Sequence, residues 1–294
     1  MTAAVTAFAP ASIGNLGVGF DMLGLALEGV GDRVTAALAD DPGVGIAEVR
    51  APGGEIHTQL PADADANTAS IAASAFWDAH GDGRGLSLIV HKGVPLKSGM
   101  GSSAASAVAA VVAVNALLPQ PLPAAALLPF ALEGEKFASQ GLHADNVAPS
   151  LFGGLVLCPQ ALLPRTMSLP VPKGVSAVLL HPELEVSTAE SRRRLAASYP
   201  MAQWLDQQAY LAAFIAACAS SDIDMIRASL KDVIIEPQRA ASVPGFADVK
   251  TAALDAGALG CSLSGSGPSI FCLVESAHAA AVAAAMEQAC RGKG

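Results

Sequence analysis

The stretch PLKSGMGSSAAS, residues 95–106, places two glycines and two adjacent serines directly before a long run of alanine and valine. Gly99 and Gly101 can adopt a positive φ without steric cost, so that the backbone N–H groups of such a loop can point outward. At the start of a helix these donors and the helix dipole form an anion-binding site, and Ser102 and Ser103 add hydroxyls for a phosphate or a metal ion. On this spacing alone, a tight strand-to-helix turn with serine caps stays open as the alternative.

Two further glycine-rich turns, SIGNLGVGFD (12–21) and SLSGSGPS (262–269), lie far from the first along the chain. The three turns could converge on one extended anion, such as a nucleotide triphosphate, although GSGP alone is typical of an ordinary hairpin. The Walker pattern is absent. A dinucleotide loop is also disfavoured, because eight residues separate Val90 from Gly99 and the first acidic residue downstream is Glu133.

The elements that must position these turns alternate irregularly, which favours an α+β fold over a doubly wound sheet. We expect strands at residues 5–9, 32–39, 86–94 and 175–180, at the end of the segment 141–157, and on both sides of the turn 262–269. Helices are expected at 66–80, 103–117, 123–139, 187–197, 201–219, 223–229, 245–257 and 276–290. The proline-rich segment 159–174 predicts a boundary between a domain of residues 1–160 and one of residues 161–294.

Composition narrows the class of protein. The net charge of the 294 residues is -9 and aromatic residues make up 4%, which argues against a nucleic-acid partner, since the one basic cluster, 192–194, is short. Five cysteines without a C-x-x-C pair argue against a disulfide framework or structural zinc. The N-terminus does not resemble a signal peptide, and the most apolar run, 104–118, is too short for a membrane span. We therefore expect a cytoplasmic enzyme.

Taken together, these stretches resemble the GHMP small-molecule kinases. PLKSGMGSSAA is similar to the family's nucleotide loop, with Met100 where leucine is usual, and GCSLSGSGPSIFCL to its late glycine motif. APASIGNLGVGFDMLGLAL, GLHADNVAPSLFGG, STAESR and EPQRAASVPGF resemble its homoserine kinase branch. The resemblance implies a ribosomal-protein-S5-like N-terminal domain and a ferredoxin-like C-terminal domain, with the substrate in the cleft between them. Relatives continue past the last helix into a further strand, whereas this sequence stops at EQACRGKG.

The resemblance also implies ATP and Mg²⁺ as cofactors. Lys92 matches a basic position that could steady the phosphates, although a solvated charge at a strand end is the alternative. Ser103, or its neighbour Ser102, and Glu135 would hold Mg²⁺, and the nearby Glu133 is better explained as a solvated helix residue. The residues expected to wrap the phosphates of ATP are Pro95, Leu96, Lys97, Ser98, Gly99, Met100, Gly101, Ser102, Ser103, Ala104 and Ala105.

The substrate implied by the resemblance is L-homoserine, a zwitterion with a primary alcohol, which would become O-phospho-L-homoserine on the way to threonine. By the resemblance, Arg192 and Arg239 would bind the carboxylate of the substrate, because a guanidinium can donate two parallel hydrogen bonds to it. Arg192 is also expected to act in catalysis. Asn146 would contact the hydroxyl of the substrate. The resemblance implies that no side chain acts as a catalytic base. The expected substrate-binding residues are Asn15, Asp21, His143, Asp145, Arg192 and Arg239.

Two alternatives to this function stay open. The chain could be another GHMP small-molecule kinase, or a relative that binds a ligand without chemistry. Relatives also suggest a homodimer as a possible assembly.

Overall fold

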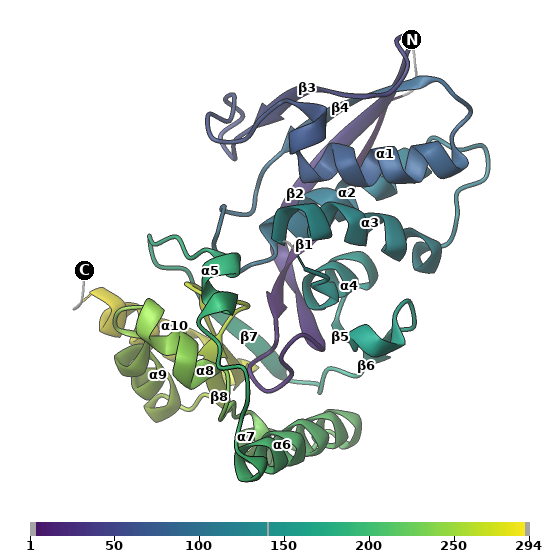
Figure 1. Cartoon of the computed structure of the whole chain (residues 1–294). Helices are drawn as coiled ribbons and strands as arrows, with labels where there is room; N and C mark the ends of the chain where they lie inside the picture. Colours follow the sequence, from purple (N-terminus) through teal and green to yellow (C-terminus); the bar gives the residue numbers. More distant parts are fainter. Residues whose placement is uncertain (1–3, 140, 292–294) are drawn as a thin grey trace.

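A long antiparallel ribbon organises the first part of the chain. The computed structural model describes residues 4–139 and 141–291. Strand β1 (Ala4–Gly14) pairs with β2 (Leu23–Ala39), and Figure 1 shows this ribbon reaching from the N-terminus down to the C-terminal part of the molecule. The pairing register shifts between Pro10 and Ser12. Because proline has no N–H to donate to a neighbouring strand, it is found where the hydrogen bonding between two strands is interrupted.

The first sheet has six strands in the order β3-β4-β2-β5-β6, with β1 also paired to β2. Strand β2 pairs antiparallel with β4 through its second half and with β5 through its beginning, whereas β3 and β4 are parallel. The remaining strands of this sheet are β3 (Val44–Arg50), β4 (Gly85–His91), β5 (Leu155–Leu157) and β6 (Met167–Leu169). Strand β4 therefore delivers the chain from the middle of the sheet into the glycine loop.

Four helices pack together beside this sheet (Figure 1). They are α1 (Thr68–His80), which follows a 3₁₀ turn at Ala64–Ala66, α2 (Ser102–Asn115), α3 (Ala124–Ser139) and α4 (Ala144–Phe152). Helix α1 begins where the Asn67 side chain accepts a hydrogen bond from the Ala69 N–H at 3.0 Å, a typical N-cap. Helix α2 is apolar on all sides and is therefore buried. Its alanines let α1, α3 and the sheet approach closely, so α2 becomes the central helix.

The C-terminal part is built on a second sheet, which is antiparallel with the order β7-β9-β8. Its strands are β7 (Val175–Leu180), β8 (Gly260–Leu263) and β9 (Ile270–Glu275). The helices of this part are α5 (Thr188–Arg193), α6 (Met201–Ser220), α7 (Ile223–Ser229), α8 (Glu236–Arg239), α9 (Phe246–Asp255) and α10 (Ala279–Arg291), with 3₁₀ turns at Gln160–Leu162, Ala240–Ser242 and Ser276–His278. Helices α9 and α10 pack against each other, and α10 also packs on β7.

One buried cluster joins the two parts. Ile13, Leu16 and Leu23, from β1, the following turn and β2, pack in the same core as Phe214 of α6 and Phe271 of β9. All five side chains are at most 1% exposed. Burial of each such side chain stabilises the fold by about 1.5–3 kcal/mol. The glycine-rich turn between β1 and β2 is therefore fixed against the C-terminal sheet.

The α+β prediction is confirmed, and most expected elements are present. The first two strands are longer than expected, the helix expected at 187–197 ends at Arg193, and β3, α4, β6 and α8 were not predicted. Strand β6 places part of the proline-rich segment in the first sheet, and the domain division at residue 160 stays a prediction. Helix α10 is the last described element, with no described strand after it. Among residues 4–139 and 141–291, no helix combines the length and apolarity of a membrane span.

Candidate active site

The glycine loop between β4 and α2 has the left-handed backbone that its sequence predicts. The φ angles of Gly99 and Gly101 are 76° and 67°, and Gly101 is the N-cap of α2. A Cβ on Gly99 would collide with the Ser264 carbonyl oxygen, and one on Gly101 with the Ser12 hydroxyl. Only glycine fits at both positions. The first N–H groups of α2 have no partner within the helix, so the loop ends in an anion-binding helix terminus.

The three glycine-rich turns converge, as the sequence suggested. The Ser264 hydroxyl donates to the Gly99 carbonyl at 2.7 Å, and the Ser269 N–H donates to the Ser98 carbonyl at 3.1 Å. The turn after β1 joins them, because the Asn15 side-chain amide donates to the Gly265 carbonyl at 2.9 Å. Segments from both sheets thus fix the phosphate loop, defined here as residues 95–105.

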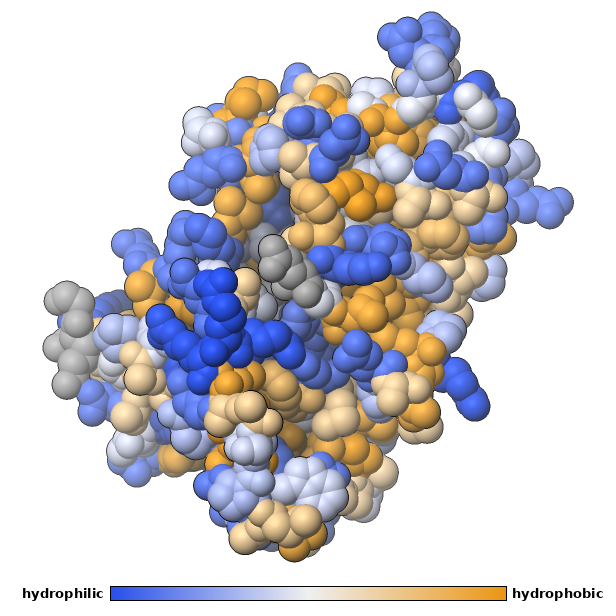
Figure 2. Space-filling model, viewed as in Figure 1, coloured by the Kyte–Doolittle hydropathy of each residue, from blue (hydrophilic) through white to orange (hydrophobic). Residues whose placement is uncertain are grey.

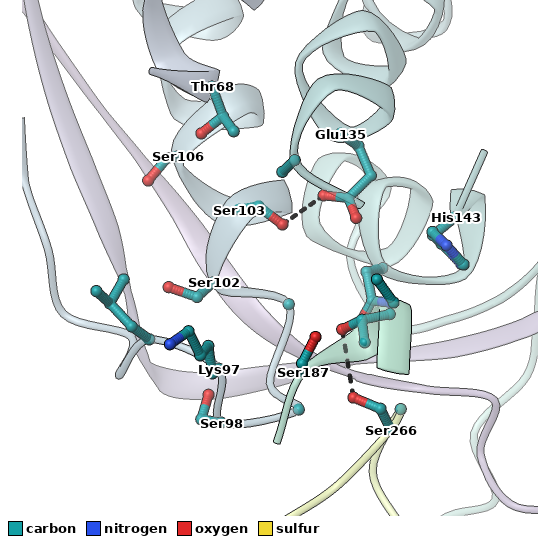
Figure 3. A pocket seen from close by; sticks show the side chains of 18 of the residues that line it. Thr68, Lys97, Ser98, Ser102, Ser103, Ser106, Glu135, His143, Ser187 and Ser266 are labelled. Carbon is teal, nitrogen blue, oxygen red and sulfur yellow. Dashed lines mark hydrogen bonds between the residues drawn. The ribbon is translucent and has the colours of Figure 1, made fainter. Parts of the chain in front are cut away.

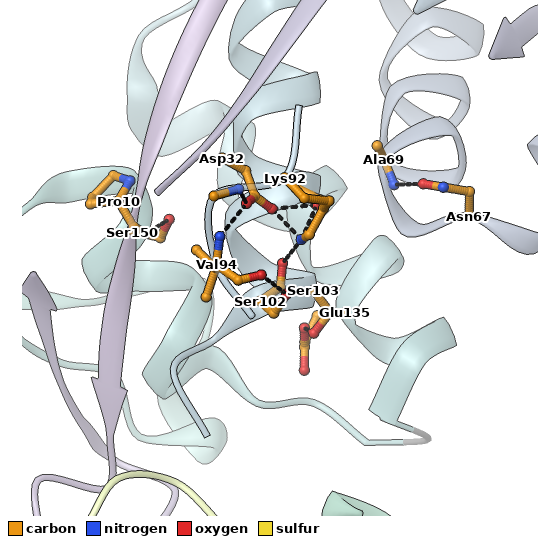
Figure 4. Close-up of polar contacts among 12 residues, drawn as sticks. Pro10, Asp32, Asn67, Ala69, Lys92, Val94, Ser102, Ser103, Glu135 and Ser150 are labelled. Atoms are coloured by element: carbon orange, nitrogen blue, oxygen red, sulfur yellow. Dashed lines mark hydrogen bonds and ion pairs between the residues drawn. The ribbon is translucent and has the colours of Figure 1, made fainter. Parts of the chain in front are cut away.

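A buried ion pair lies behind the phosphate loop (Figure 4). The Lys92 ammonium contacts the Asp32 carboxylate, and it also donates to the Ser106 hydroxyl at 2.8 Å and to the Ser102 carbonyl at 2.9 Å. The other Asp32 oxygen accepts from the N–H groups of Gly93 and Val94 at 2.8 and 3.0 Å. Lys92 is 4% exposed, so it is no solvated charge at a strand end. Asp32 was not predicted as a site residue; its only signal was that it is the one acidic residue in the strand expected at 32–39.

Of the two serines considered as metal ligands, Ser103 meets the acidic partner. Its hydroxyl donates to the Glu135 carboxylate at 2.6 Å (Figure 3), whereas the Ser102 hydroxyl donates to the Val94 carbonyl at 3.0 Å. Glu135 is 4% exposed. Glu133 pairs with Lys136 at the surface, in agreement with its expected solvated role. A buried carboxylate and a hydroxyl beside a helix N-terminus are oxygen donors of the kind that Mg²⁺ prefers.

At the other end of the site, Asp21 and Arg192 are paired. The Arg192 Nη2 donates to both Asp21 carboxylate oxygens, at 2.7 and 2.8 Å, and lies 3.3 Å from the His143 Nδ1. Burial opposes ionisation of Asp21, but hydrogen bonds from His143 and Arg192 hold the pKa of Asp21 below its usual value. Burial likewise opposes the charge on His143, whereas its hydrogen bond to Asp21 and the negative charge of Asp145 raise the pKa of His143.

Asp145 ties helix α4 to the turn after β1. Its carboxylate accepts from the Asn15 backbone N–H at 2.9 Å, and the Asn15 side-chain oxygen accepts from the Asp21 N–H at 3.0 Å. Complete burial, followed by the charge of Asp21, raises the pKa of Asp145 to about 6. The next residue, Asn146, accepts from the Ser12 hydroxyl at 3.0 Å. Asn15, Leu16 and Asp21 have φ angles of 66°, 43° and 56°, so the turn holds three non-glycine residues with positive φ.

Arg239 reaches the same end from α8. It is 4% exposed, and its Nη1 donates to the Gly265 carbonyl at 2.9 Å. Burial, followed by the charge of Arg192, lowers the pKa of Arg239. In Figure 2 strongly hydrophilic side chains gather over α5 and the segment after it, which carry Arg192, Arg193 and Arg194.

These groups share one cavity of about 640 Å³ (Figure 3). Of the residues expected from sequence, those that line it are Asn15, Asp21, Lys92, Leu96, Lys97, Ser98, Gly99, Gly101, Ser102, Ser103, Glu135, His143, Asp145, Asn146, Arg192 and Arg239. Four residues of the phosphate loop do not: Pro95 is exposed, and Met100, Ala104 and Ala105 are buried.

Some of the residues that line the cavity were not predicted. They include Gln59, Leu60, Ala66, Asn67, Thr68 and Val90. Ala66, Asn67 and Thr68 belong to the helix expected at 66–80, but none of the six was predicted as a site residue. Ser187, Thr188 and Ser266 were also missed as lining residues, although their motifs had been noted.

Comparison with known proteins shows the family of the chain. Two family models match the chain: the GHMP kinases N terminal domain at residues 67–154 and the GHMP kinases C terminal domain at residues 214–292. A homoserine kinase of Xanthomonas campestris pv. campestris is 45% identical over 283 residues, which cover 96% of this chain and 86% of the relative. One of Chloroherpeton thalassium is 41% identical, covering 98% and 92%.

The crystal structure of a homoserine kinase from Cytophaga hutchinsonii is 42% identical and superposes with a TM-score of 0.93, covering 99% of this chain and 92% of that one. A mevalonate kinase from L. major shares the fold at 15% identity and a TM-score of 0.71. Both family models, the extent of the identities and the structural match agree. The chain therefore belongs to the GHMP kinase family, in its homoserine kinase branch.

Proposed function

We propose that the chain transfers the γ-phosphoryl group of ATP to the primary hydroxyl of L-homoserine and releases ADP and O-phospho-L-homoserine. The observation that carries this proposal is that one cavity joins an anion-binding loop to a cluster of charges suited to a zwitterion. A kinase needs both ends within reach of each other, because phosphoryl transfer depends mainly on positioning and on neutralising charge.

At the phosphate end, the first N–H groups of α2 and the loop around Gly99 and Gly101 would cradle the phosphates of ATP. Ser103 and Glu135 would hold Mg²⁺, and their oxygens, 2.6 Å apart and partly buried, fit that role. When bound, the ion would neutralise charge on the phosphates. Lys92 would act from behind the loop, because its ammonium is already committed to Asp32, Ser102 and Ser106.

At the amino-acid end, Asp21 would bind the ammonium group of homoserine, with His143 and Asp145 beside it. Arg192 and Arg239 would bind the carboxylate, because a guanidinium can donate two parallel hydrogen bonds to it. In the structure Arg192 already holds a carboxylate, that of Asp21, at 2.7 and 2.8 Å. The substrate carboxylate would offer Arg192 the same kind of partner.

For the transfer itself, Asn146 would contact the substrate hydroxyl, and its side chain is oriented by the Ser12 hydroxyl. The hydroxyl oxygen forms a bond to the γ-phosphorus, and the bond from that phosphorus to the bridging oxygen breaks with its electron pair on ADP. The hydroxyl proton is released in the same reaction. No side chain is assigned as a general base, so the rate would come from positioning and from stabilising the charge of the transition state.

The test is an assay of ADP release with Mg²⁺-ATP and a panel of alcohols. We expect turnover with L-homoserine and none with mevalonate or a sugar. Turnover with another alcohol only would move the chain to a different specificity within the family. Calorimetric binding of homoserine without turnover would favour the non-catalytic alternative.

The homodimer is a separate proposal, which light scattering of the purified chain tests. Helix α6 offers apolar surface for it, because three of its large side chains are exposed: Met201, Trp204 and Leu205.

A further inference from the structure

Phe20 contacts both arginines of the amino-acid end without being among the residues that line the cavity. Its ring belongs to the turn between β1 and β2 and is half-buried. The Arg192 Cζ lies 5.2 Å from the centroid of this ring and the Arg239 Cζ lies 5.1 Å from it. The face of an aromatic ring attracts a cation at such distances. One ring is thus shared by two guanidinium groups from two different helices, α5 and α8.

The other contacts of the two arginines hold only part of each guanidinium group. Their like charges repel, and the charge of Arg192 contributes to lowering the pKa of Arg239. The Nε atoms of both are buried, and neither has a hydrogen-bond partner among the described residues. Arg192 extends from a helix of six residues, and its side chain is 40% exposed. A long side chain of this kind keeps many rotamers unless its surroundings restrict them.

Asp21 restrains Arg192 from one side only. Its carboxylate binds the Nη2 end of the guanidinium, whereas Phe20, the preceding residue, covers the guanidinium with its ring. Arg239 has no such carboxylate among the described hydrogen bonds and ion pairs; a carbonyl oxygen, that of Gly265, accepts from its Nη1. The ring is therefore the contact that the two arginines have in common.

We propose that Phe20 is a positioning residue that holds Arg192 and Arg239 in one geometry for the substrate carboxylate. This inference rests on the proposed function, in which those arginines bind the carboxylate of homoserine. Phe20 acts through the arginines and does not touch the substrate. Its loss must therefore weaken the binding of the amino acid and leave the nucleotide end, whose residues 95–105 and Glu135 lie elsewhere in the chain, unchanged.

The experiment compares the KM for homoserine and the KM for ATP in three variants. In Phe20→Leu, which keeps an apolar side chain without a ring, we expect the KM for homoserine to rise roughly tenfold. The KM for ATP should change by less than about twofold, since the phosphate loop does not contact the ring. Phe20→Tyr keeps the aromatic face and should retain a homoserine KM within about threefold of the unsubstituted chain.

Phe8→Leu is the matched control. Phe8 lies on β1 with the Arg33 Cζ at 5.0 Å from its ring centroid, a similar contact remote from the cavity. It should leave both KM values within about twofold. Thermal melts of all variants, compared with the unsubstituted chain, exclude a general loss of folded protein.

The outcomes separate this inference from the proposed function. Absence of homoserine turnover in the unsubstituted chain refutes the proposed function. Normal turnover there, with an unchanged homoserine KM in Phe20→Leu, refutes the inference alone. A parallel rise of both KM values with a lower melting temperature would also overturn it, because that result indicates a merely structural role for the ring.

Discussion

The buried pair of Lys92 and Asp32 allows a decisive experiment, because a lysine beside a phosphate loop can act either on the nucleotide or on the fold. The side chains of the two residues are 3% and 0% exposed. Replacing Lys92 with methionine removes the cation and leaves the Asp32 carboxylate buried. Breaking a buried ion pair on one side costs about 3–5 kcal/mol of the free energy of unfolding. The Gly93 and Val94 N–H groups still bind the carboxylate, which places our expectation near the lower limit, at about 3 kcal/mol.

The second half of the experiment is a double-mutant cycle. Asp32→Asn removes the charge but keeps one acceptor oxygen, and its amide would then face the Lys92 ammonium, donor against donor. We expect it to be destabilising by a similar amount, about 3 kcal/mol. The variant with both changes leaves neither charge buried, and should be less destabilised than the sum of the single changes by at least about 1 kcal/mol. Urea unfolding without nucleotide measures all four proteins.

Lys97→Met supplies the control for the loss of a positive charge nearby in the sequence, within the phosphate loop itself. The Lys97 ammonium pairs with Glu185 at 2.8 Å, but the two side chains are 60% and 51% exposed. Pairs of this kind contribute about 0–1 kcal/mol. The refuting result is a Lys92→Met protein whose free energy of unfolding lies within about 0.5 kcal/mol of the unsubstituted chain but which has lost its affinity for ATP. Lys92 would then not act by holding the loop from behind. That result would favour direct contact with the phosphates instead.

Three further outcomes are expected. Glu135→Ala should lower kcat by roughly 100-fold or more if it is a metal ligand, whereas Glu133→Ala should leave kcat within about twofold; equal effects would contradict the assignment. Gly101→Ala should raise the KM for ATP and lower the free energy of unfolding by about 1–2 kcal/mol, because its φ is 67° and its Cβ would meet the Ser12 hydroxyl. The pKa of Asp145 is about 6 in the folded chain, above the unfolded value, so stability should fall as the pH rises from about 4 to 6, and urea unfolding of Asp145→Asn should show a smaller fall.

The phosphate loop was predictable from sequence because its constraints are local. Gly99 and Gly101 are needed for the backbone of the loop itself, and the alanine-rich run after them is needed for a helix buried on all sides. The pairing of Ser103 with Glu135 was reachable only through the family resemblance, since 32 residues separate the two. A local pattern cannot state which side chains meet across such a distance.

The other parts of the site depend on tertiary contacts that no local pattern carries. Asp32 and Lys92 are 60 residues apart, and a lone acidic residue in a strand predicts a surface charge more readily than a buried one. Helix α4 was missed because a proline and two glycines follow its first turns within a short segment. Phe20 was quoted within its motif without a role, because its contacts are made with α5 and α8, more than 170 residues further along the chain.

The pairing of Asp21 with Arg192 bears on which ligands the proposed amino-acid end can accept. The charges of Asp21 and Arg192 neutralise each other in the structure. A ligand that separates the two side chains must therefore supply an opposite charge to each of them. A zwitterion can do so, since its ammonium group meets Asp21 and its carboxylate meets Arg192. An amine without a carboxylate would occupy Asp21 and leave the half-buried Arg192 without an anion. An unpaired charge in a buried site is costly, so selectivity for amino acids over simple amino alcohols follows from the site's own ion pair as much as from new contacts with the substrate.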